Sequence, residues 1–255
     1  MIRKIAAVAL AATVALPAAA LADSAALTFG FGAKMRPDYP GADNYGVGAS
    51  GFVRLHGLSF GGVTVGNPDG RSGQRELGWG LRGAFATTPE RKAKDHPELA
   101  GMEDVDFALE LGLGIGYEAD YWRAFLDVRK GVTGHYGTVA VLGADAKIPA
   151  GEQFTLSIGP RLTFASQGYF DTYYGVTAAE AAAGSLSQFA PKDGLLSAGI
   201  EVTAAYDFGN DWGIEGKASY GWLQGDAKDS PITQLGNDKQ GQVSLMLTRR
   251  IAFDF

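Results

Sequence analysis

Apolar and polar residues alternate along most of the chain, with a period of two residues. Such alternation is typical of β-strands whose two faces meet different surroundings. It is clearest over residues 105–118, 153–165, 195–208, 211–223 and 241–255. It is weaker over residues 25–36, 45–55, 58–65, 76–87, 121–131 and 136–148. The sequence therefore predicts an all-β protein with eleven strands.

These strands are about 8 to 15 residues long, and a tilted strand needs roughly 9–11 residues to cross a bilayer. Because lipid offers the backbone no hydrogen-bond partners, a spanning sheet must close into a barrel. The apolar face then meets lipid, and acids and bases are expected to pair on the inner face. The candidate lumen charges are Glu110, Arg123, Asp127, Arg129, Arg161, Glu201, Glu215 and Lys217. The residues Trp122, Trp212 and Trp222 lie near strand ends, where an aromatic girdle is expected.

The count of eleven predicted strands is odd, whereas single-chain bacterial barrels have even strand numbers. The weakest segment is 58–65, where Gly61 and Gly62 interrupt the alternation. The expectation is an antiparallel transmembrane β-barrel of 10–12 strands: ten if this segment does not cross, twelve if a further strand exists. A soluble periplasmic β-sandwich or a lipocalin-like barrel also alternates. It would have to expose the lumen charges and bury the tryptophans in a dry core.

Both ends of the chain carry export signals. Residues 1–22 combine a basic start, Arg3 and Lys4, with an apolar stretch, Pro17 and a small-residue end, which is the layout of a cleaved signal peptide. An uncleaved anchor helix is the alternative. Residues 23–255 would then form a single barrel domain. The last predicted strand ends on Phe255 and resembles the signal that outer-membrane barrels present to their assembly machinery. The expected location is the outer membrane of a Gram-negative bacterium, with membrane lipid and that machinery as partners.

Charge and cysteine content exclude several classes of partner and site. The net charge is −6, from 22 basic and 28 acidic residues, and loss of the two basic residues in 1–22 would make it −8. Nucleic acid is a poor partner for such a chain, since phosphate binding needs a basic face. The chain has no cysteine, which excludes disulfides and thiolate metal sites.

Catalytic chemistry has few candidate residues. The three histidines are His56 in a predicted turn, His96 in a charged loop predicted to be exposed, and His135 near a strand end. A pair between His135 and Ser166 or Ser219 is conceivable on a barrel wall, but no feature of the sequence selects it. Metalloprotease, nucleophile-elbow and P-loop motifs are all missing from the sequence. We therefore expect no enzyme activity, no cofactor and no metal.

Connection lengths predict which end of the barrel faces outward. Counting back from a periplasmic C-terminus places the long connections 88–104, 167–194 and 224–240 outside. The short links 118–120, 149–152 and 209–211 fall on the periplasmic side, which is the asymmetry expected of such barrels. Within the second loop, the Ala-rich stretch from Thr177 to Leu186 predicts a turn or two of helix.

Three loop segments resemble motifs of the MipA/OmpV family of outer-membrane proteins. They are Tyr173-Tyr174-Gly175-Val176-Thr177, then Gly225-Asp226-Ala227-Lys228-Asp229-Ser230-Pro231-Ile232, and Pro37-Asp38-Tyr39-Pro40-Gly41. We interpret the residues of the first two motifs as structural before functional. The Asp229-Ser230-Pro231 segment is typical of a turn, and the tyrosines either line the outer mouth or pack within a folded loop.

This resemblance implies a scaffold that brings a murein lytic transglycosylase together with a murein polymerase. Other family members are porin-like or adhesive, so a channel for small solutes and a surface adhesin are alternatives. The short predicted periplasmic turns count against the scaffold, because they leave little surface on which an enzyme could dock.

Overall fold

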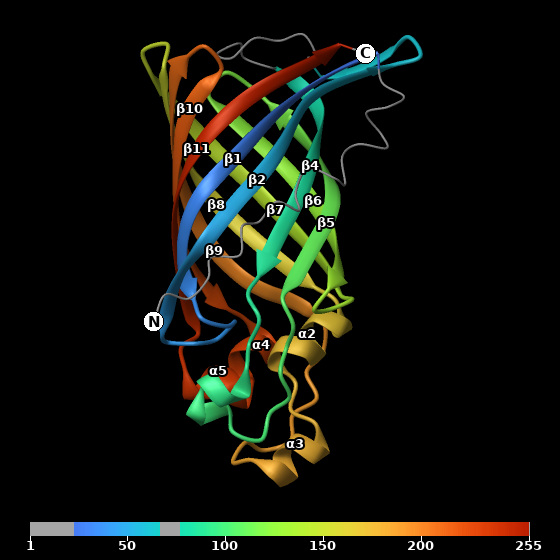
Figure 1. Ribbon diagram of the computed structural model, residues 1–255, viewed down its shortest axis with the longest axis vertical. Coiled ribbons are helices and arrows are strands. Elements are labelled where there is room, and N and C mark those ends of the chain that lie inside the picture. Colours follow the sequence, from blue (N-terminus) through green and yellow to red (C-terminus); the bar gives the residue numbers. More distant parts are fainter. Residues whose placement is uncertain (1–22, 67–76, 255) are drawn as a thin grey trace, which may run out of the picture.

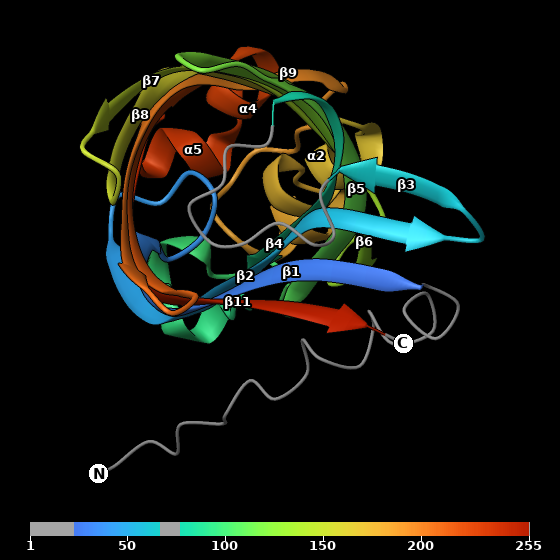
Figure 2. The ribbon, with the colours of Figure 1, turned by 90° about the horizontal axis from the view of Figure 1, so that it is seen from above.

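The computed structural model describes residues 23–66 and 77–254, so the predicted signal peptide and Phe255 lie outside the described residues. Every strand belongs to one antiparallel sheet in the order β3-β2-β1-β11-β10-β9-β8-β7-β6-β5-β4. Strands β2 and β4 lie side by side, so the curled sheet forms a barrel (Figures 1 and 2). The strands are β1 Ser24–Pro37, β2 Tyr45–Phe60, β3 Val63–Gly66, β4 Gly78–Thr88, β5 Ala108–Glu118, β6 Trp122–Thr133, β7 Thr138–Ala150, β8 Phe154–Ala165, β9 Gly194–Gly209, β10 Trp212–Leu223 and β11 Lys239–Asp254.

The boundary between the second and third predicted strands was wrong. The expected turn at His56 is absent from β2, which continues to Phe60 while pairing with β1, and His56 Nε2 lies 2.8 Å from Thr28 Oγ1. The turn follows at Gly61 and Gly62, whose φ angles of 55° and 81° suit a two-residue hairpin. Strand β3 has four residues, whereas the other ten strands have 11–16. Ten strands of the described chain are thus long enough to cross a bilayer.

The outer surface of the barrel is apolar. Alternate residues such as Leu113, Val243 and Leu245 are 50–65% exposed. The side chains of Trp122 and Trp212 are exposed at the first positions of β6 and β10, and Trp222 is exposed one residue before the end of β10. This is the distribution expected for a lipid-facing band with aromatic residues at its edges. No helix within residues 23–66 and 77–254 is long and apolar enough to cross a membrane.

The two ends of the barrel differ in the length of their connections (Figure 1). Four short links, residues 61–62, 119–121, 151–153 and 210–211, join strands at what we call the turn end, where Ser24 of β1 also pairs with Asp254 of β11. The long connections emerge at the opposite loop end and carry short helices. These are η1 Ala93–Asp95, η2 Pro97–Leu99, α2 Gln167–Tyr174, α3 Ala178–Ala183, α4 Gly225–Asp229 and α5 Pro231–Leu235. The helix predicted between residues 177 and 186 is confirmed as α3.

Candidate functional site

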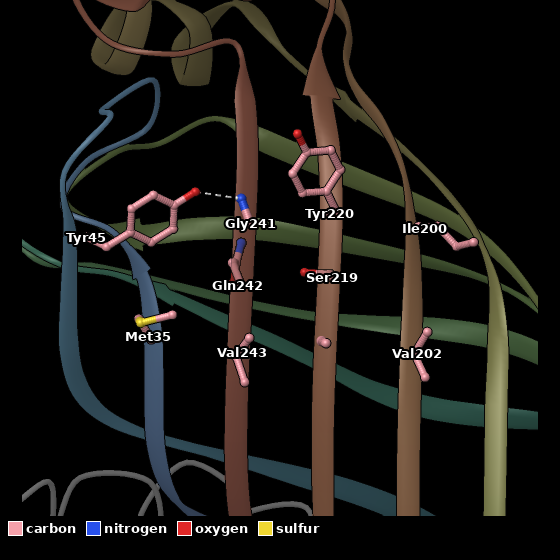
Figure 3. Close-up of a pocket in the computed structure, with 10 residues that line it drawn as sticks. Met35, Tyr45, Ile200, Val202, Ser219, Tyr220, Gly241, Gln242 and Val243 are labelled. Atoms are coloured by element: carbon pink, nitrogen blue, oxygen red, sulfur yellow. Dashed lines mark hydrogen bonds between the residues drawn. The ribbon is translucent and has the colours of Figure 1, made fainter.

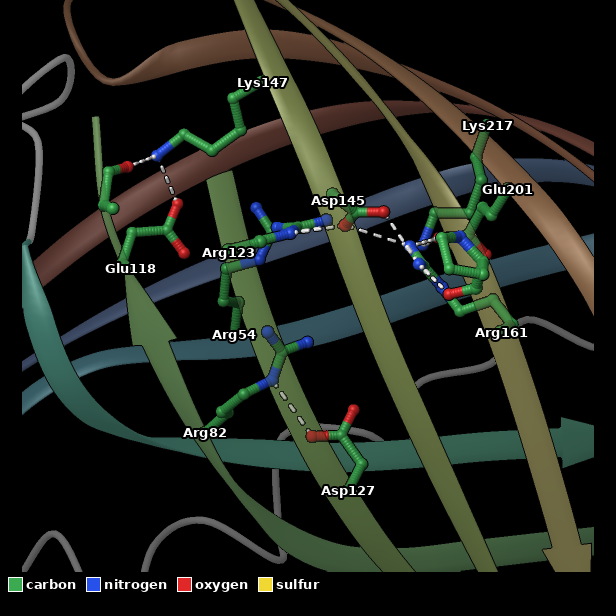
Figure 4. A network of polar contacts seen from close by, with 12 residues as sticks. Arg54, Arg82, Glu118, Arg123, Asp127, Asp145, Lys147, Arg161, Glu201 and Lys217 are labelled. Atoms are coloured by element: carbon green, nitrogen blue, oxygen red, sulfur yellow. Dashed lines mark hydrogen bonds and ion pairs between the residues drawn. The ribbon is translucent and has the colours of Figure 1, made fainter. Parts of the chain in front are cut away.

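Ion pairs between strands line the lumen, most of them between neighbouring strands, and we call them the lumen network; Figure 4 shows part of it. The network holds the contacts Arg54–Glu215 at 2.9 Å, Arg82–Asp127 at 3.0 Å, Arg123–Asp145 at 2.6 Å, Arg129–Glu110 at 2.8 Å, Arg161–Asp145 at 2.7 Å, Arg161–Glu201 at 3.0 Å and Lys217–Glu201 at 3.6 Å. The structure places all eight candidate lumen charges in these pairs. Each of the five carboxylates in these pairs, Glu110, Asp127, Asp145, Glu201 and Glu215, therefore has a cation beside it.

The centre of the network is Asp145 on β7. Its side chain accepts hydrogen bonds from Arg123 Nε at 2.6 Å and from Arg161 Nη1 at 2.7 Å, and the residue is 3% exposed. The register explains the first contact, because Arg123 and Asp145 are directly opposite on β6 and β7. Two guanidinium groups lie over the neighbouring ring of Phe125. The distance to the ring centre is 4.2 Å from Arg82 and 5.0 Å from Arg161. Cation–π contacts of this kind stabilise closely packed arginines.

Sequence reasoning missed three members of the network, Arg54, Arg82 and Asp145. They lie in the segments 45–55, 76–87 and 136–148, where glycine and alanine weaken the alternation. The sequence signal that could have found them is the alternation of inward and outward positions, since each residue occupies an inward position of its strand. A charged residue at an inward position therefore indicates a lumen contact even where the apolar face is poorly marked.

Glycine makes room for these side chains. A β-carbon added at Gly114 would lie 2.0 Å from Asp127 Oδ1, and one at Gly143 would lie 2.3 Å from the tip of the Phe125 ring. Both distances are far inside van der Waals contact. The lumen network therefore depends on having glycine at these neighbouring positions as well as on its charges.

The long connections fold together into a loop cap at the loop end of the barrel. One apolar core packs Tyr169, Phe170, Tyr173 and Tyr174 of α2 against Ala227 of α4 and the ends of several strands. A second core joins Tyr39, Ala42, Leu99, Met102, Val176, Leu186 and Ile232, which come from four different connections. The side chains of Tyr173, Tyr174 and Val176 are at most 1% exposed. The tyrosines of the first motif thus pack within a folded loop and do not rim an open mouth.

Hydrogen bonds connect the two family motifs inside the loop cap. The Ser230 hydroxyl donates to the Tyr174 carbonyl at 2.7 Å and accepts from the Ile232 amide at 3.2 Å, and Ser230 is fully buried. Ser230 thereby caps α5, which begins at Pro231, a favoured first helical residue. Asp229 ends α4, and Asp226 Oδ2 accepts from the Lys192 amide at 2.6 Å. The Asp-Ser-Pro segment is a two-helix corner that holds the Tyr-Tyr segment in place.

A second set of polar contacts ties the 89–107 connection to α3. Thr177 and Glu180 form a capping box, and Glu180 Oε1 also accepts from the Glu103 amide at 3.0 Å. Burial raises the pKa of Glu180, but hydrogen bonds from Glu103 and Thr177, with the charge of Arg91, outweigh burial and lower it below its usual value. The buried Arg91 side chain also donates to the Tyr173 carbonyl at 3.4 Å. Gly175, the residue directly after α2, lies between these contacts.

The histidines are engaged in structural contacts. His135 is 2% exposed, its Nδ1 accepts from the Gly137 amide at 3.2 Å, and its Nε2 therefore carries the proton that points to Glu110 at 3.3 Å. In residues 23–66 and 77–254 no hydrogen bond joins His135 to Ser166 or Ser219, and Ser166 Oγ accepts from the Thr138 amide. His135 is therefore not placed to act as the base that activates either serine as a nucleophile.

The prediction that His96 is solvent-exposed was wrong. Its ring packs edge-on against Tyr39 at 4.9 Å and its Nδ1 lies 3.6 Å from Glu98, with 16% of the side chain exposed. His96 is half-buried because the 89–107 connection packs against the rest of the loop cap. Among the described residues, no group of three or more His, Asp or Glu side chains is arranged to hold a metal ion.

A cavity of about 500 Å³ lies between the lumen network and the loop cap. Its walls include charges of the network such as Arg54, Arg82 and Glu110, and its lining on the cap side includes Tyr169 and Tyr174. A separate hollow of about 310 Å³ lies on the outer, apolar face between Met35, Tyr45, Ile200, Tyr220 and Val243 (Figure 3). There the Tyr45 hydroxyl accepts from the Gly241 amide at 3.0 Å. The polar cavity inside the barrel is therefore the candidate site for a soluble ligand.

Comparison with known proteins identifies relatives of the chain. The family model described as "MltA-interacting protein MipA" matches residues 29–251. Proteins named MltA-interacting protein from Escherichia coli (strain K12) and Shigella flexneri are each 33% identical over 78 residues, a segment that spans 31% of this chain and 31% of each relative. Among solved structures, Neisserial surface protein A matches 91% of this chain and 97% of its own at 9% identity and a TM-score of 0.31. The outer membrane protein OprG from Pseudomonas aeruginosa matches 92% and 97% at 15% identity and a TM-score of 0.32.

Proposed function

The chain belongs to the MipA family of outer-membrane β-barrels, and from this premise we propose that it is a closed barrel that anchors murein-processing enzymes at the periplasmic face. The partners would be a murein lytic transglycosylase and, through it, a murein polymerase. The relatives from Escherichia coli and Shigella flexneri are named for an interaction with MltA, which supports the first partner. The proposal gives the barrel a binding role and assigns no catalytic residue.

The observation that carries the proposal is the loop cap above a paired lumen. Two apolar cores and the Ser230–Tyr174 contact hold the connections together over the loop end. Below them all five carboxylates of the lumen network have a cationic partner. A barrel filled in this way is suited to anchoring, since small barrels are filled by side chains and only large ones leave a wide aqueous channel.

The proposed orientation places the turn end in the periplasm and the loop cap outside. Bacterial barrels have short periplasmic turns and longer extracellular loops, and here four short links and the paired ends of β1 and β11 lie together. Removal of residues 1–22 on export is part of the same proposal. The matured chain would then begin next to Ser24, at the turn end.

A docking surface is available at the turn end in spite of the short links. The β2–β3 hairpin projects away from the ring of strands (Figure 2). Near its tip Phe60 is 51% exposed and Val63 is 65% exposed. Because β2 continues past the predicted turn at His56, this surface was not apparent from the sequence. We place the contact with the transglycosylase on the hairpin.

A binding experiment with matched variants tests this placement. Purified barrel in detergent is titrated with the purified lytic transglycosylase, first as wild type and then as Phe60→Ser with Val63→Ser. The control is Leu235→Ser, which removes a comparably exposed apolar side chain, 45% exposed, at the loop end. We expect the hairpin variant to weaken binding at least about tenfold, as loss of an interface anchor does, and the control to bind normally. Absence of binding by the wild type would refute the scaffold, and equal binding by all three would refute the hairpin.

A porin-like channel is the second candidate, and the cavity of about 500 Å³ is the observation that favours it. A solute path would need the loop cap to open above that cavity. Conductance across a planar bilayer separates the two functions, because only an open channel gives stable steps. The third possibility, an adhesin, would use the outer surface of the loop cap, and binding to host cells by variants altered at exposed cap residues would test it.

A further inference from the structure

The cavity inside the barrel has more cations than carboxylates. Eight basic side chains of the described residues line it: Lys34, Arg36, Arg54, Arg82, Arg123, Arg129, Arg161 and Lys217. The carboxylates that pair with these cations are Glu110, Asp127, Asp145, Glu201 and Glu215. Among the residues that the structure describes, the cavity therefore has three more cations than paired carboxylates, although the whole chain has a net charge of −6. Charge of one sign inside low-dielectric walls attracts the opposite ion strongly.

The surplus is concentrated on β1, at Lys34 and Arg36. Within residues 23–66 and 77–254 neither side chain has a carboxylate within ion-pair distance, although Arg36 donates to the Thr87 carbonyl. The two residues are two positions apart, so their side chains leave the same inward face of the strand. Both line the cavity. They differ in this from the arginines of the lumen network, which already have partners.

The strand register adds a third cation and a hydroxyl to this group. Lys34 is opposite Ser244 on β11, and Ser244 is opposite Lys217 on β10. Neighbouring strands are about 4.8 Å apart, so the two lysines flank the serine in one row across the wall. Ser244 and Lys217 line the same cavity. A hydroxyl between two ammonium groups is a suitable environment for an oxyanion.

We propose that the cavity beneath the loop cap binds a small soluble oxyanion, a solute that carries a phosphate or carboxylate group. Lys34 and Arg36 supply the free charges, and Lys217 and Ser244 supply further contacts. The cavity volume of about 500 Å³ lies within the range of small-molecule sites, roughly 300–1,000 Å³. The bound anion neutralises charge that the five carboxylates leave uncompensated. This site is separate from the proposed docking hairpin at the turn end.

Titration calorimetry with inorganic phosphate tests the proposal. The folded protein is held in a phosphate-free, non-ionic detergent, so that no lipid headgroup can supply the anion, and sodium chloride of equal ionic strength is the reference. We expect phosphate to bind above the chloride reference and its Kd to rise at least about tenfold in Lys34→Gln, the effect of losing one charge-assisted contact. The control Lys94→Gln removes an exposed loop cation and leaves the Kd unchanged.

The unfolding temperature of the same variants gives an independent readout. Without phosphate, Lys34→Gln is expected to unfold at a higher temperature than wild type, because one uncompensated charge is gone. With phosphate, the wild type gains stability and the variant gains less. Arg36→Gln is the second variant if Lys34→Gln fails to fold. Phosphate binding that does not exceed the chloride reference, or that is unchanged in the folded Lys34 or Arg36 variant, would overturn the proposal.

Discussion

The most demanding prediction concerns Asp145, which lies between two arginines in the lumen. In Asp145→Asn the side chain keeps its shape and loses its charge, so Arg123 and Arg161 lose contacts of 2.6 and 2.7 Å in a site where the residue is 3% exposed. Removing one partner of a buried pair costs about 3–5 kcal/mol, because the remaining charge is left uncompensated. Arg161 keeps Glu201 at 3.0 Å, so we expect the lower end, about 3 kcal/mol.

The cause can be separated from general damage by a second substitution. Arg123 has its ion pair with Asp145 alone among the described residues. Adding Arg123→Gln to Asp145→Asn therefore removes the stranded charge and should recover part of the lost stability. Glu90→Gln, at the exposed pair with Lys92, is the matched control and should leave stability unchanged.

The assay is equilibrium unfolding in detergent, followed by tryptophan fluorescence. All four tryptophans, Trp79, Trp122, Trp212 and Trp222, are 39–71% exposed on the outer face, so their emission reports loss of the detergent-covered barrel. If Asp145→Asn unfolds at the wild-type denaturant concentration, or if the double variant is less stable than the single one, the reasoning about the lumen network is refuted.

Three further predictions concern the loop cap and the lumen. Ser230→Ala leaves the buried Tyr174 carbonyl without its donor, at a cost of about 1–3 kcal/mol, and should speed tryptic cleavage of the cap; unchanged cleavage would contradict it. Glu180 has a lowered pKa, so its contribution is complete above its unfolded pKa near 4.3 and is lost as pH falls through the folded value. Hydrogen exchange of the cap should therefore accelerate below about pH 4 in wild type, and Glu180→Gln should lack that step. Gly143→Val places carbon atoms against the Phe125 ring, and its cold-gel mobility should show an unfolded protein.

Much of the barrel could be predicted from the sequence because each crossing strand carries its own signal. Alternation places Leu113 and Val243 outside and Glu110 inside without any knowledge of neighbouring strands. The error at β2 arose because the Gly57 position resembled a turn, whereas pairing with β1 extends the strand to Phe60. The local sequence pattern does not contain the pairing between strands. The hydrogen bonds between β2 and β1 determine where β2 ends.

The loop cap could not be predicted in the same way. Its helices have three to eight residues, too few for a periodic pattern, and only the Ala-rich α3 was recognisable. The contacts that assemble it join residues far apart in the chain, such as Ser230 and Tyr174. The motifs identified these segments, but whether they fold inward or extend outward depends on long-range packing. The free charges of Lys34 and Arg36 were missed for a related reason, since pairing is a property of neighbouring strands.

The central claim is that the loop cap closes the barrel, and planar-bilayer conductance tests it most directly. Wild-type protein, shown to be folded by its cold-gel mobility shift, is compared with Tyr173→Ala, which opens a gap in the first apolar core. We predict no steady open level for the wild type and discrete conductance steps for the variant. Stable conductance steps from the wild type would contradict the account and make the channel the leading function.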